Sequence, residues 1–151
     1  MTGDTKIAIR RLARKDVPEV AANEALCFTQ PWAEHNFLEA LDRKDLLYVV
    51  ADADGHIVGH AGVFTVMGDG EIINVAVHPE HRGKGIAYQM LSYLMEIAPE
   101  IGTEDFTLEV RAGNAAAIRL YEKLGFETEG VRPGFYDFPK EDALIMWKRK
   151  R

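Results

Sequence analysis

Two closely spaced glycines mark the part of the chain best suited to binding a ligand. Gly83 and Gly85 follow a run of β-branched residues and precede an apolar helical pattern that begins at Ile86. Glycines in such a connection leave backbone N–H groups unobstructed, and the start of a helix adds partial positive charge. Arg82 and Lys84 place formal positive charge at the same point, which suits a diphosphate better than a single carboxylate. The sequence therefore predicts an anion-binding turn between a strand and a helix.

Two common nucleotide-binding motifs are excluded by their spacing. A P-loop requires Gly-x-x-x-x-Gly-Lys-Ser/Thr, but no glycine stands five residues before Gly83, and Lys84 is followed by Gly85. The dinucleotide fingerprint requires a third glycine where this chain has Tyr88. On spacing alone, a glycine-rich connection that binds no ligand stays open as an alternative.

The same turn carries a family signature. Residues 82–87 read Arg-x-x-Gly-x-Ala directly after a strand that ends in Val-His-Pro. This pattern resembles the acetyl-coenzyme A (acetyl-CoA) signature of the GNAT N-acetyltransferases. The resemblance implies that acetyl-CoA is the acetyl donor and that the turn binds its pyrophosphate. It assigns donor contacts to Val75, Ala76, Val77, Arg82, Gly83, Lys84, Gly85, Ile86, Ala87, Asn114, Ala117 and Tyr121.

A second stretch, residues 108–126, contains Leu-Glu-Val-Arg, then Asn-x-x-Ala, then Leu-Tyr-x-x-Leu-Gly-Phe. It is similar to the second GNAT motif and, in its first four residues, to the RimI branch, the ribosomal-protein-alanine N-acetyltransferases. The resemblance implies direct attack of an amine on the thioester, with Glu109 as general base and Tyr121 as general acid. It also implies that Asn114 contacts the coenzyme A arm.

The chemistry of acetyl transfer fits these residue types. A peptide α-amine has a pKa of roughly 8 and is mostly protonated at neutral pH, so a base must take its proton, directly or through water. Glu109 alternates with Leu108 and Val110 and therefore points away from them, toward either a cleft or solvent. The leaving thiolate needs a proton donor, which Tyr121 can supply unless it is a buried core residue. A backbone N–H near Val77 is the simplest oxyanion donor.

Two further segments resemble the acceptor-binding loops of the RimI branch. Pro31-Trp32 corresponds to a Pro-Trp pair between the first helices, and residues 132–136 correspond to an Arg-x-x-Tyr-Tyr loop. The resemblance implies that Trp32, Arg132, Phe135 and Tyr136 bind the acceptor. Phe135 departs from the pattern because it lacks the tyrosine hydroxyl. Trp32 and Phe135 could instead be simple hydrophobic anchors of their loops.

The periodicity of the chain predicts an α+β domain. Alternating or β-branched runs predict strands, and Asp54-Gly55 predicts a hairpin between two of them. The order of elements is that of the GNAT fold, with a mixed, mostly antiparallel sheet of six to seven strands and about four helices on its faces. The predicted strands are residues 6–11, 46–51, 57–66, 71–77, 106–110, 126–131 and 143–148; the predicted helices are 16–28, 33–41, 83–97 and 115–124, and residues 132–142 are predicted to be irregular.

Length and composition bound the class of protein. The 151 residues predict a single domain over residues 1–151, with flexible ends at residues 1–5 and 148–151. The net charge of −6 argues against direct binding of nucleic acid and favours a cationic partner. The resemblance implies such a partner: a protein N-terminus, most specifically the N-terminal alanine of a basic small-subunit ribosomal protein. The oligomeric state stays open.

Cysteine, histidine and hydropathy patterns suggest no metal or membrane role. Cys27 is the only cysteine, so an intrachain disulfide and a cysteine-based zinc site are excluded, and its place in a helical pattern predicts a buried filler. His78 and His81 flank a proline turn with poor ligand spacing, and no metal is expected. No apolar run approaches the roughly 20 residues of a membrane span, so a cytoplasmic protein is expected.

Two other functions stay open at this level. A GNAT enzyme could acetylate a small-molecule amine, because the donor-binding signature carries no information about the acceptor. A non-catalytic acetyl-CoA-binding module would keep the glycine turn but would need neither Glu109 nor Tyr121.

Overall fold

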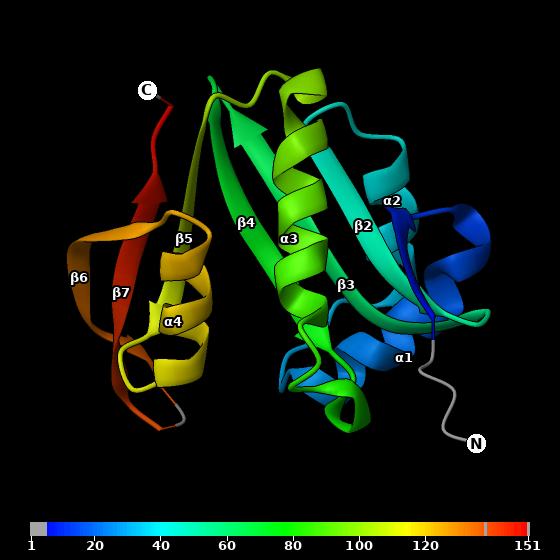
Figure 1. The fold of residues 1–151 in the computed structure, drawn as a ribbon, viewed down its shortest axis with the longest axis horizontal. Coiled ribbons are helices and arrows are strands. Elements are labelled where there is room, and N and C mark those ends of the chain that lie inside the picture. The colour runs from blue at the N-terminus through cyan, green and yellow to red at the C-terminus, as the bar shows by residue number, and fades with distance from the viewer. Residues whose placement is uncertain (1–5, 138, 151) are drawn as a thin grey trace.

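The computed structural model describes residues 6–137 and 139–150, and these form an α+β fold around one mixed seven-stranded sheet (Figure 1). The strand order is β1-β2-β3-β4-β5-β7-β6. The mixed, mostly antiparallel sheet predicted from the sequence is confirmed. The strands are β1 (Ile7–Arg11), β2 (Leu46–Ala53), β3 (His56–Val66), β4 (Asp69–Val77), β5 (Asp105–Arg111), β6 (Glu127–Tyr136) and β7 (Glu141–Lys148). The α-helices are α1 (Val17–Cys27), α2 (Glu34–Leu41), α3 (Ile86–Ile97) and α4 (Ala115–Lys123), and short 3-10 helices cover Arg14–Asp16, Pro79–His81 and Ala98–Ile101.

Strands β2, β3 and β4 form the predicted antiparallel meander. Asp54 and Gly55 have φ angles of 51° and 90° in the first hairpin, and Met67 and Gly68 have φ angles of 51° and 89° in the second. Two consecutive residues with positive φ form the tight turn whose twist matches that of the flanking strands. The Asp-Gly signal in the sequence is thus confirmed as a hairpin.

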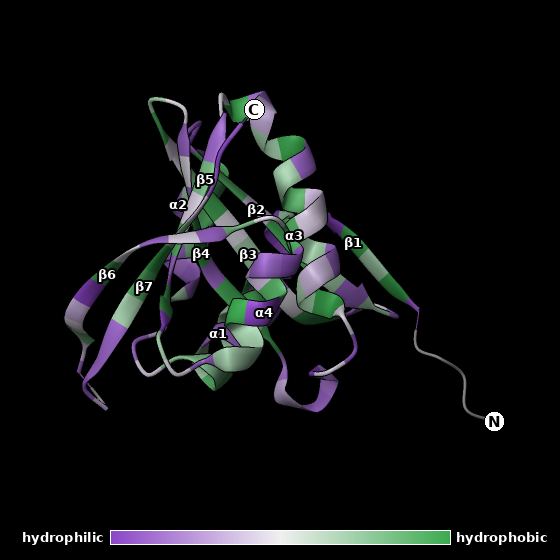
Figure 2. Ribbon diagram, turned by 60° about the vertical axis from the view of Figure 1, so that its left-hand side comes forward, coloured by the Kyte–Doolittle hydropathy of each residue, from purple (hydrophilic) through white to green (hydrophobic). Residues whose placement is uncertain are grey.

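Helices cover both faces of the sheet. Figure 1 shows α3 and α4 on one face, with α1 and α2 behind β2 and β3 on the other. One buried cluster contains the α3 side chains Met90, Leu91 and Leu94, and a second contains Val20 of α1 and Phe37 of α2. Figure 2 shows that the edge strand β6 is mostly hydrophilic or neutral, and this strand is largely exposed.

The parallel pair β4–β5 is short. Residues 69–71 pair with residues 105–107, but β4 continues to Val77 and β5 to Arg111 without further pairing between them. The two strands diverge in Figure 1 toward the start of α3. On its other side, β4 shifts register against β3 near Asn74, which has a φ of 54°. Such a bulge bends a strand, so part of the β4 backbone faces an opening in the sheet.

The segment predicted to be irregular, residues 132–142, is largely a hairpin, and that prediction was wrong. Strand β6 runs to Tyr136, and β7 begins at Glu141. Pro133 is tolerated because β6 is an edge strand, where its missing N–H need not remove a ladder hydrogen bond. The pairing shifts register between Arg132 and Tyr136, which accommodates Pro133 and Gly134.

Of the ends predicted to be flexible, residues 1–5 and 151 lie outside the described residues, whereas residues 148–150 make defined contacts. Lys148 closes β7, and its Nζ donates to the carbonyl of Leu124 at 2.7 Å. Arg149 forms an ion pair with Glu129 at 2.6 Å, and the backbone N–H of Lys150 donates to Asp105 at 2.7 Å. These contacts tie the last described residues to β5, β6 and the end of α4.

The tight contact at Gly62 supplies a test of the core. A Cβ at Gly62 would overlap ring carbons of Tyr48, which is buried against α2. Overpacking of this kind costs about 1–3 kcal/mol, so Gly62→Ala should lower the free energy of unfolding by that amount in a denaturant titration. Gly130→Ala is the matched control, because its nearest neighbour outside the adjoining residues, the Cδ1 of Ile145, lies 3.6 Å away. Equal stability of both variants would contradict the packing described here.

Candidate active site

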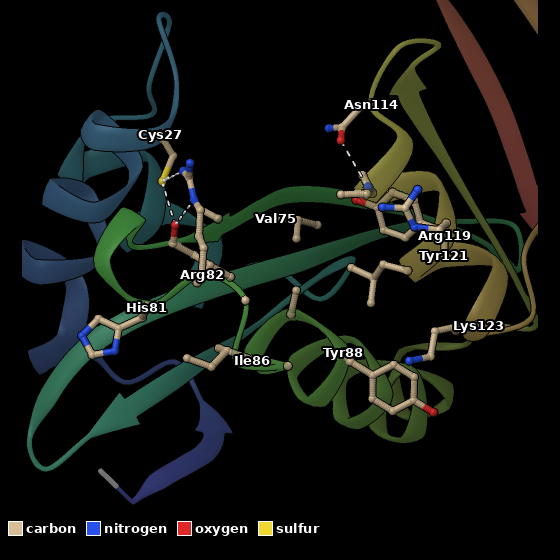
Figure 3. Close-up of a pocket in the computed structure, with 18 of the residues that line it drawn as sticks. Cys27, Val75, His81, Arg82, Ile86, Tyr88, Asn114, Arg119, Tyr121 and Lys123 are labelled. Atoms are coloured by element: carbon tan, nitrogen blue, oxygen red, sulfur yellow. Dashed lines mark hydrogen bonds between the residues drawn. The ribbon is translucent and has the colours of Figure 1, made fainter. Parts of the chain in front are cut away.

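A cavity of about 650 Å³ lies between the end of β4, the start of α3 and the facing side of α4 (Figure 3). Figure 3 shows Cys27 and Arg82 on one side and Asn114 and Tyr121 on the other, with Val75 between them. The cavity contains all of the predicted donor-binding residues except Lys84: Val75, Ala76, Val77, Arg82, Gly83, Gly85, Ile86, Ala87, Asn114, Ala117 and Tyr121. The structure therefore brings together residues that are up to 46 positions apart in the chain.

The glycine turn at the mouth of this cavity fits a diphosphate. Gly83 and Gly85 have φ angles of 78° and 77°, and a Cβ at either position would meet no atom within 4 Å. Gly85 is the N-cap of α3, so the free N–H groups of the first helical turn follow it directly. A side chain at either glycine would strain the backbone and cover these groups.

The side chain of Arg82 points away from the glycine turn and contacts the ends of β4 and α1. Its Nε donates to the carbonyl of Val77 at 3.1 Å, and one terminal nitrogen lies 3.6 Å from the sulfur of Cys27 (Figure 3). Arg82 thus joins the end of α1 to the end of β4. Positive charge near the cavity also comes from Arg119 and Lys123 of α4, which line it.

A second cavity, of about 580 Å³, adjoins the first. It is lined by Glu109, Arg111 and Tyr136, and by residues of the α1–α2 connection and of β4. The two cavities have in common Cys27, Phe28, Val75, Asn114, Ala117 and Tyr121. A donor in the first cavity and an acceptor in the second would therefore meet beside Tyr121.

Glu109 lines the second cavity. The alternation of residues in the strand had left open whether its side chain faces a cleft or solvent. Its side chain is 21 % exposed, and its Oε2 is buried with no hydrogen-bond partner among the described residues. Its Oε1 lies 3.6 Å from a terminal nitrogen of Arg132. One carboxylate oxygen therefore has unused capacity to accept a hydrogen bond or a proton.

Tyr121 lines both cavities and is only 9 % exposed. Burial, with a smaller effect of Tyr136, raises the pKa of Tyr121 to about 12. The hydroxyl consequently keeps its proton at neutral pH and can act as a hydrogen-bond or proton donor.

Of the predicted acceptor-binding residues, Tyr136 lines the second cavity and Arg132 contacts Glu109. Burial raises the pKa of Tyr136, and the charge of Glu109 raises it further. The guanidinium of Arg111 lies 4.2 Å from the centre of the Tyr136 ring, a cation–π contact that orients the ring.

Phe135 and Trp32 lie outside both cavities. Phe135 is 45 % exposed, with Arg132 over its ring at 5.4 Å. The Trp32 ring packs against Phe37 and Tyr48, with centroid distances of 5.2 and 5.7 Å. Trp32 anchors the α1–α2 connection, and other residues of that connection, Phe28, Thr29 and Gln30, line the second cavity.

Sequence reasoning missed several residues of the site. Cys27 is half-buried and lines both cavities, so its prediction as buried filler was wrong. Asn74 lines the second cavity, and it could have been noticed as the one polar residue in the apolar run Ile72–Val77. Burial, and then the charge of Glu109, raises the pKa of Glu71 on β4. Glu71 and Glu109 thus place two interacting carboxyl groups on neighbouring strands.

Within residues 6–137 and 139–150, no group of three or more His, Cys, Asp or Glu side chains is arranged to hold a metal ion. His78 and His81 stack edge to face with ring centroids 5.8 Å apart. None of the helices in the described part of the chain is long and apolar enough to cross a bilayer.

Comparisons with known proteins agree with this geometry. Residues 17–126 match the family described as "Acetyltransferase (GNAT) family". A Bacillus subtilis protein, provisionally named a ribosomal protein bS18-alanine N-acetyltransferase, is 38% identical over 144 residues and 95% of both chains. An Escherichia coli protein of that name is 31% identical over 140 residues, which are 91% of this chain and 94% of the relative.

The fold is also similar to a solved structure. The crystal structure of the ribosomal-protein-S18-alanine N-acetyltransferase from Escherichia coli superposes with a TM-score of 0.84 and 30% sequence identity. The match covers 95% of this chain and 94% of that chain.

The high pKa of Tyr121 can be tested without reference to any reaction. Because its pKa is raised from about 10 to about 12, Tyr121 should add no tyrosinate absorbance below about pH 10.5. Titrations of the folded protein and of Tyr121→Phe should therefore coincide in that range. In concentrated guanidinium chloride the parent chain should show one more ionising tyrosine than the variant. The same difference in the folded state would contradict the assigned burial.

Proposed function

The chain belongs to the GNAT acetyltransferase family, and we propose that it transfers the acetyl group of acetyl-CoA to the N-terminal α-amine of a protein. It is an acyltransferase, as its named relatives are. One observation carries the proposal: Glu109, one of whose carboxylate oxygens has no hydrogen-bond partner among the described residues, lines a cavity that meets the donor cavity beside the protonated Tyr121.

GNAT acetyltransferases use acetyl-CoA, and the residues of the first cavity suit it. Acetyl-CoA supplies an acetyl thioester. The N–H groups after Gly83 and Gly85 would bind its pyrophosphate. The part of β4 that does not pair with β5, from Val75 to Val77, would bind its arm beside Asn114. Ala76, Ile86, Ala87 and Ala117 complete this wall of the cavity, while Arg82 holds it in place and Lys84 adds charge at the turn.

On the acceptor side, the α-amine arrives as an ammonium ion that Glu109 attracts. Glu109 accepts a proton, directly or through water, and the neutral nitrogen attacks the thioester carbonyl. The new C–N bond forms as the C–S bond breaks, and Tyr121 donates its proton to the departing sulfur. The second proton that the acylated nitrogen must lose then returns to the Tyr121 phenolate, directly or through water, and Glu109 releases its own proton to solvent. A backbone N–H near Val77 is the proposed hydrogen-bond donor to the carbonyl oxygen.

The acceptor that we propose is the N-terminal alanine of a small-subunit ribosomal protein, since two relatives are named for that reaction on bS18. The net charge of −6 favours a basic chain, and Glu109 places negative charge at the second cavity. Tyr136 and Arg132 contact the acceptor in this proposal. Phe135 lies at the exposed rim, and Trp32 acts by anchoring its connection.

The role of Glu109 is tested by replacing its carboxylate with an amide. Glu109→Gln should lower turnover by about 10²–10⁴-fold, the usual contribution of a general base. The acetyl-CoA dissociation constant, measured by titration calorimetry, should stay unchanged because Glu109 does not line the donor cavity. Glu96→Gln is the control, because Glu96 is exposed on α3. Turnover of Glu109→Gln equal to that of the control at every pH would remove Glu109 as the base.

The acceptor class is tested with matched peptides. A basic peptide that begins Ala-Arg with a free amine should release coenzyme A and gain one acetyl group by mass spectrometry. The same peptide with a blocked N-terminus should do neither. Equal release from both peptides would exclude the α-amine as acceptor. Faster turnover of a polyamine or aminoglycoside than of any free peptide would favour a small-molecule amine acceptor instead.

A further inference from the structure

A buried polar network centred on Glu24 and His60 lies beside the second cavity, which is called the acceptor cavity below. None of the catalytic steps proposed above involves this network. Glu24 on α1 is 2 % exposed, and His60 on β3 is fully buried. Glu24 stands between Val20 and Cys27 on the side of α1 that packs on the sheet. Burying a carboxylate is costly unless it is hydrogen-bonded, so the partners of Glu24 indicate why it is there.

His60 orients one oxygen of this carboxylate. The Nε2 of His60 lies 2.8 Å from the Oε1 of Glu24, and the Nδ1 of His60 lies 3.1 Å from the Nδ2 of Asn23. An ionised carboxylate can only accept, and an amide nitrogen can only donate. These partners assign the His60 tautomer with its hydrogen on Nε2 and its lone pair on Nδ1.

The other oxygen of Glu24 joins two separate walls of the acceptor cavity. Its Oε2 accepts a hydrogen bond from the backbone N–H of Trp32 at 3.1 Å. It also accepts one from the side-chain amide of Asn74 at 2.8 Å. The Oδ1 of Asn74 in turn accepts from the hydroxyl of Tyr48 at 2.9 Å. One carboxylate therefore receives three donors, from β3, β4 and the α1–α2 connection.

Both walls carry residues that line the cavity. Asn74 lies at the bulge of β4 with a φ of 54° and lines the acceptor cavity, and the next residue, Val75, lines both cavities. Trp32 ends the stretch whose residues Phe28 and Gln30 line the opposite side. The distance between the bulge of β4 and the α1–α2 connection therefore sets the width of the acceptor cavity.

We propose that Glu24, oriented by His60, is a positioning residue for the acceptor: it fixes the bulge of β4 and the α1–α2 connection at the spacing that the acceptor amine requires. The kinetic part of this inference rests on the proposed function. Removing Glu24 leaves the partly buried donors of Trp32 and Asn74 without this partner, so the segments that carry them are no longer held together. The acceptor cavity then changes shape, while the glycine turn of the donor cavity does not.

The test compares two substitutions of the same size at Glu24. Glu24→Leu removes every acceptor and should raise the acceptor-peptide KM about tenfold or more, the order expected when buried donors lose their partners. The dissociation constant of acetyl-CoA should change much less than the peptide KM, because Glu24 makes no contact with the glycine turn proposed to bind the pyrophosphate. Glu24→Gln should restore the KM, because its amide oxygen can accept from Trp32 and Asn74. The amide nitrogen of the introduced glutamine can donate to Nε2 of His60 if His60 carries its hydrogen on Nδ1 instead. That Nδ1–H can donate to the Oδ1 of Asn23, which has no partner among the described residues of the parent protein.

A variant elsewhere separates positioning from general stability. Thr65→Val breaks the buried Thr65–Thr103 hydrogen bond of 2.7 Å, which lies away from both cavities. It should lower the melting temperature without raising the peptide KM. His60→Leu should raise the KM in the same direction as Glu24→Leu and by less, so it serves if Glu24→Leu does not fold. Equal KM values for Glu24→Leu, His60→Leu and Thr65→Val would overturn the proposal.

A fluorescence measurement reports the position of the connection without any acceptor. The chain has two tryptophans, so in a Trp147→Phe background the emission comes from Trp32 alone. Glu24→Leu should shift this emission to the red and increase acrylamide quenching, whereas Glu24→Gln should not. Unchanged emission in folded Glu24→Leu would overturn the positioning role. If the parent protein acetylates no peptide, the proposed function fails, and a red shift still supports the structural part of the inference.

Discussion

The short parallel pairing of β4 with β5 is the constraint on which the rest of the site depends. Only residues 69–71 and 105–107 pair, so the strands separate where the glycine turn and α4 approach them. Backbone groups that a continuous sheet would use are left for a ligand, and they sit at the bottom of the donor cavity. The part of β5 that borders this gap, residues 108–111 with Glu109 among them, lines the second cavity.

The bulge that helps to separate the strands has a cost, and the buried network offsets it. A left-handed conformation costs roughly 1–2 kcal/mol for most residues but less for asparagine, which occupies the position at Asn74. The side chain of Asn74 is held at both ends, by Glu24 and by Tyr48. Polar residues in the core therefore coincide with the irregularity of the sheet, and the surrounding apolar packing of Phe37 and Tyr48 keeps them out of water.

Local signals in the sequence predicted most of the framework. Asp54-Gly55 fixed one hairpin, and the Gly83 turn and the helix after it were predicted from residue type alone. The β6–β7 hairpin was not, because Pro133 and Gly134 suggest a loop unless the edge position of the strand is known. The network of Glu24 was also out of reach, since its partners His60 and Asn74 stand 36 and 50 residues away. Side-chain direction at Trp32 and Lys84 likewise depends on tertiary packing.

The position of Cys27 has a practical consequence. It is the only cysteine in the sequence, and its side chain stands where the two cavities meet. A thiol-reactive reagent therefore has a single attachment point in this protein, at a place that either bound substrate would shield. The rate at which Cys27 is alkylated would report the fraction of protein with ligand bound, without a radioactive label or a coupled assay. A fluorophore attached to Cys27 would respond to ligands in either cavity.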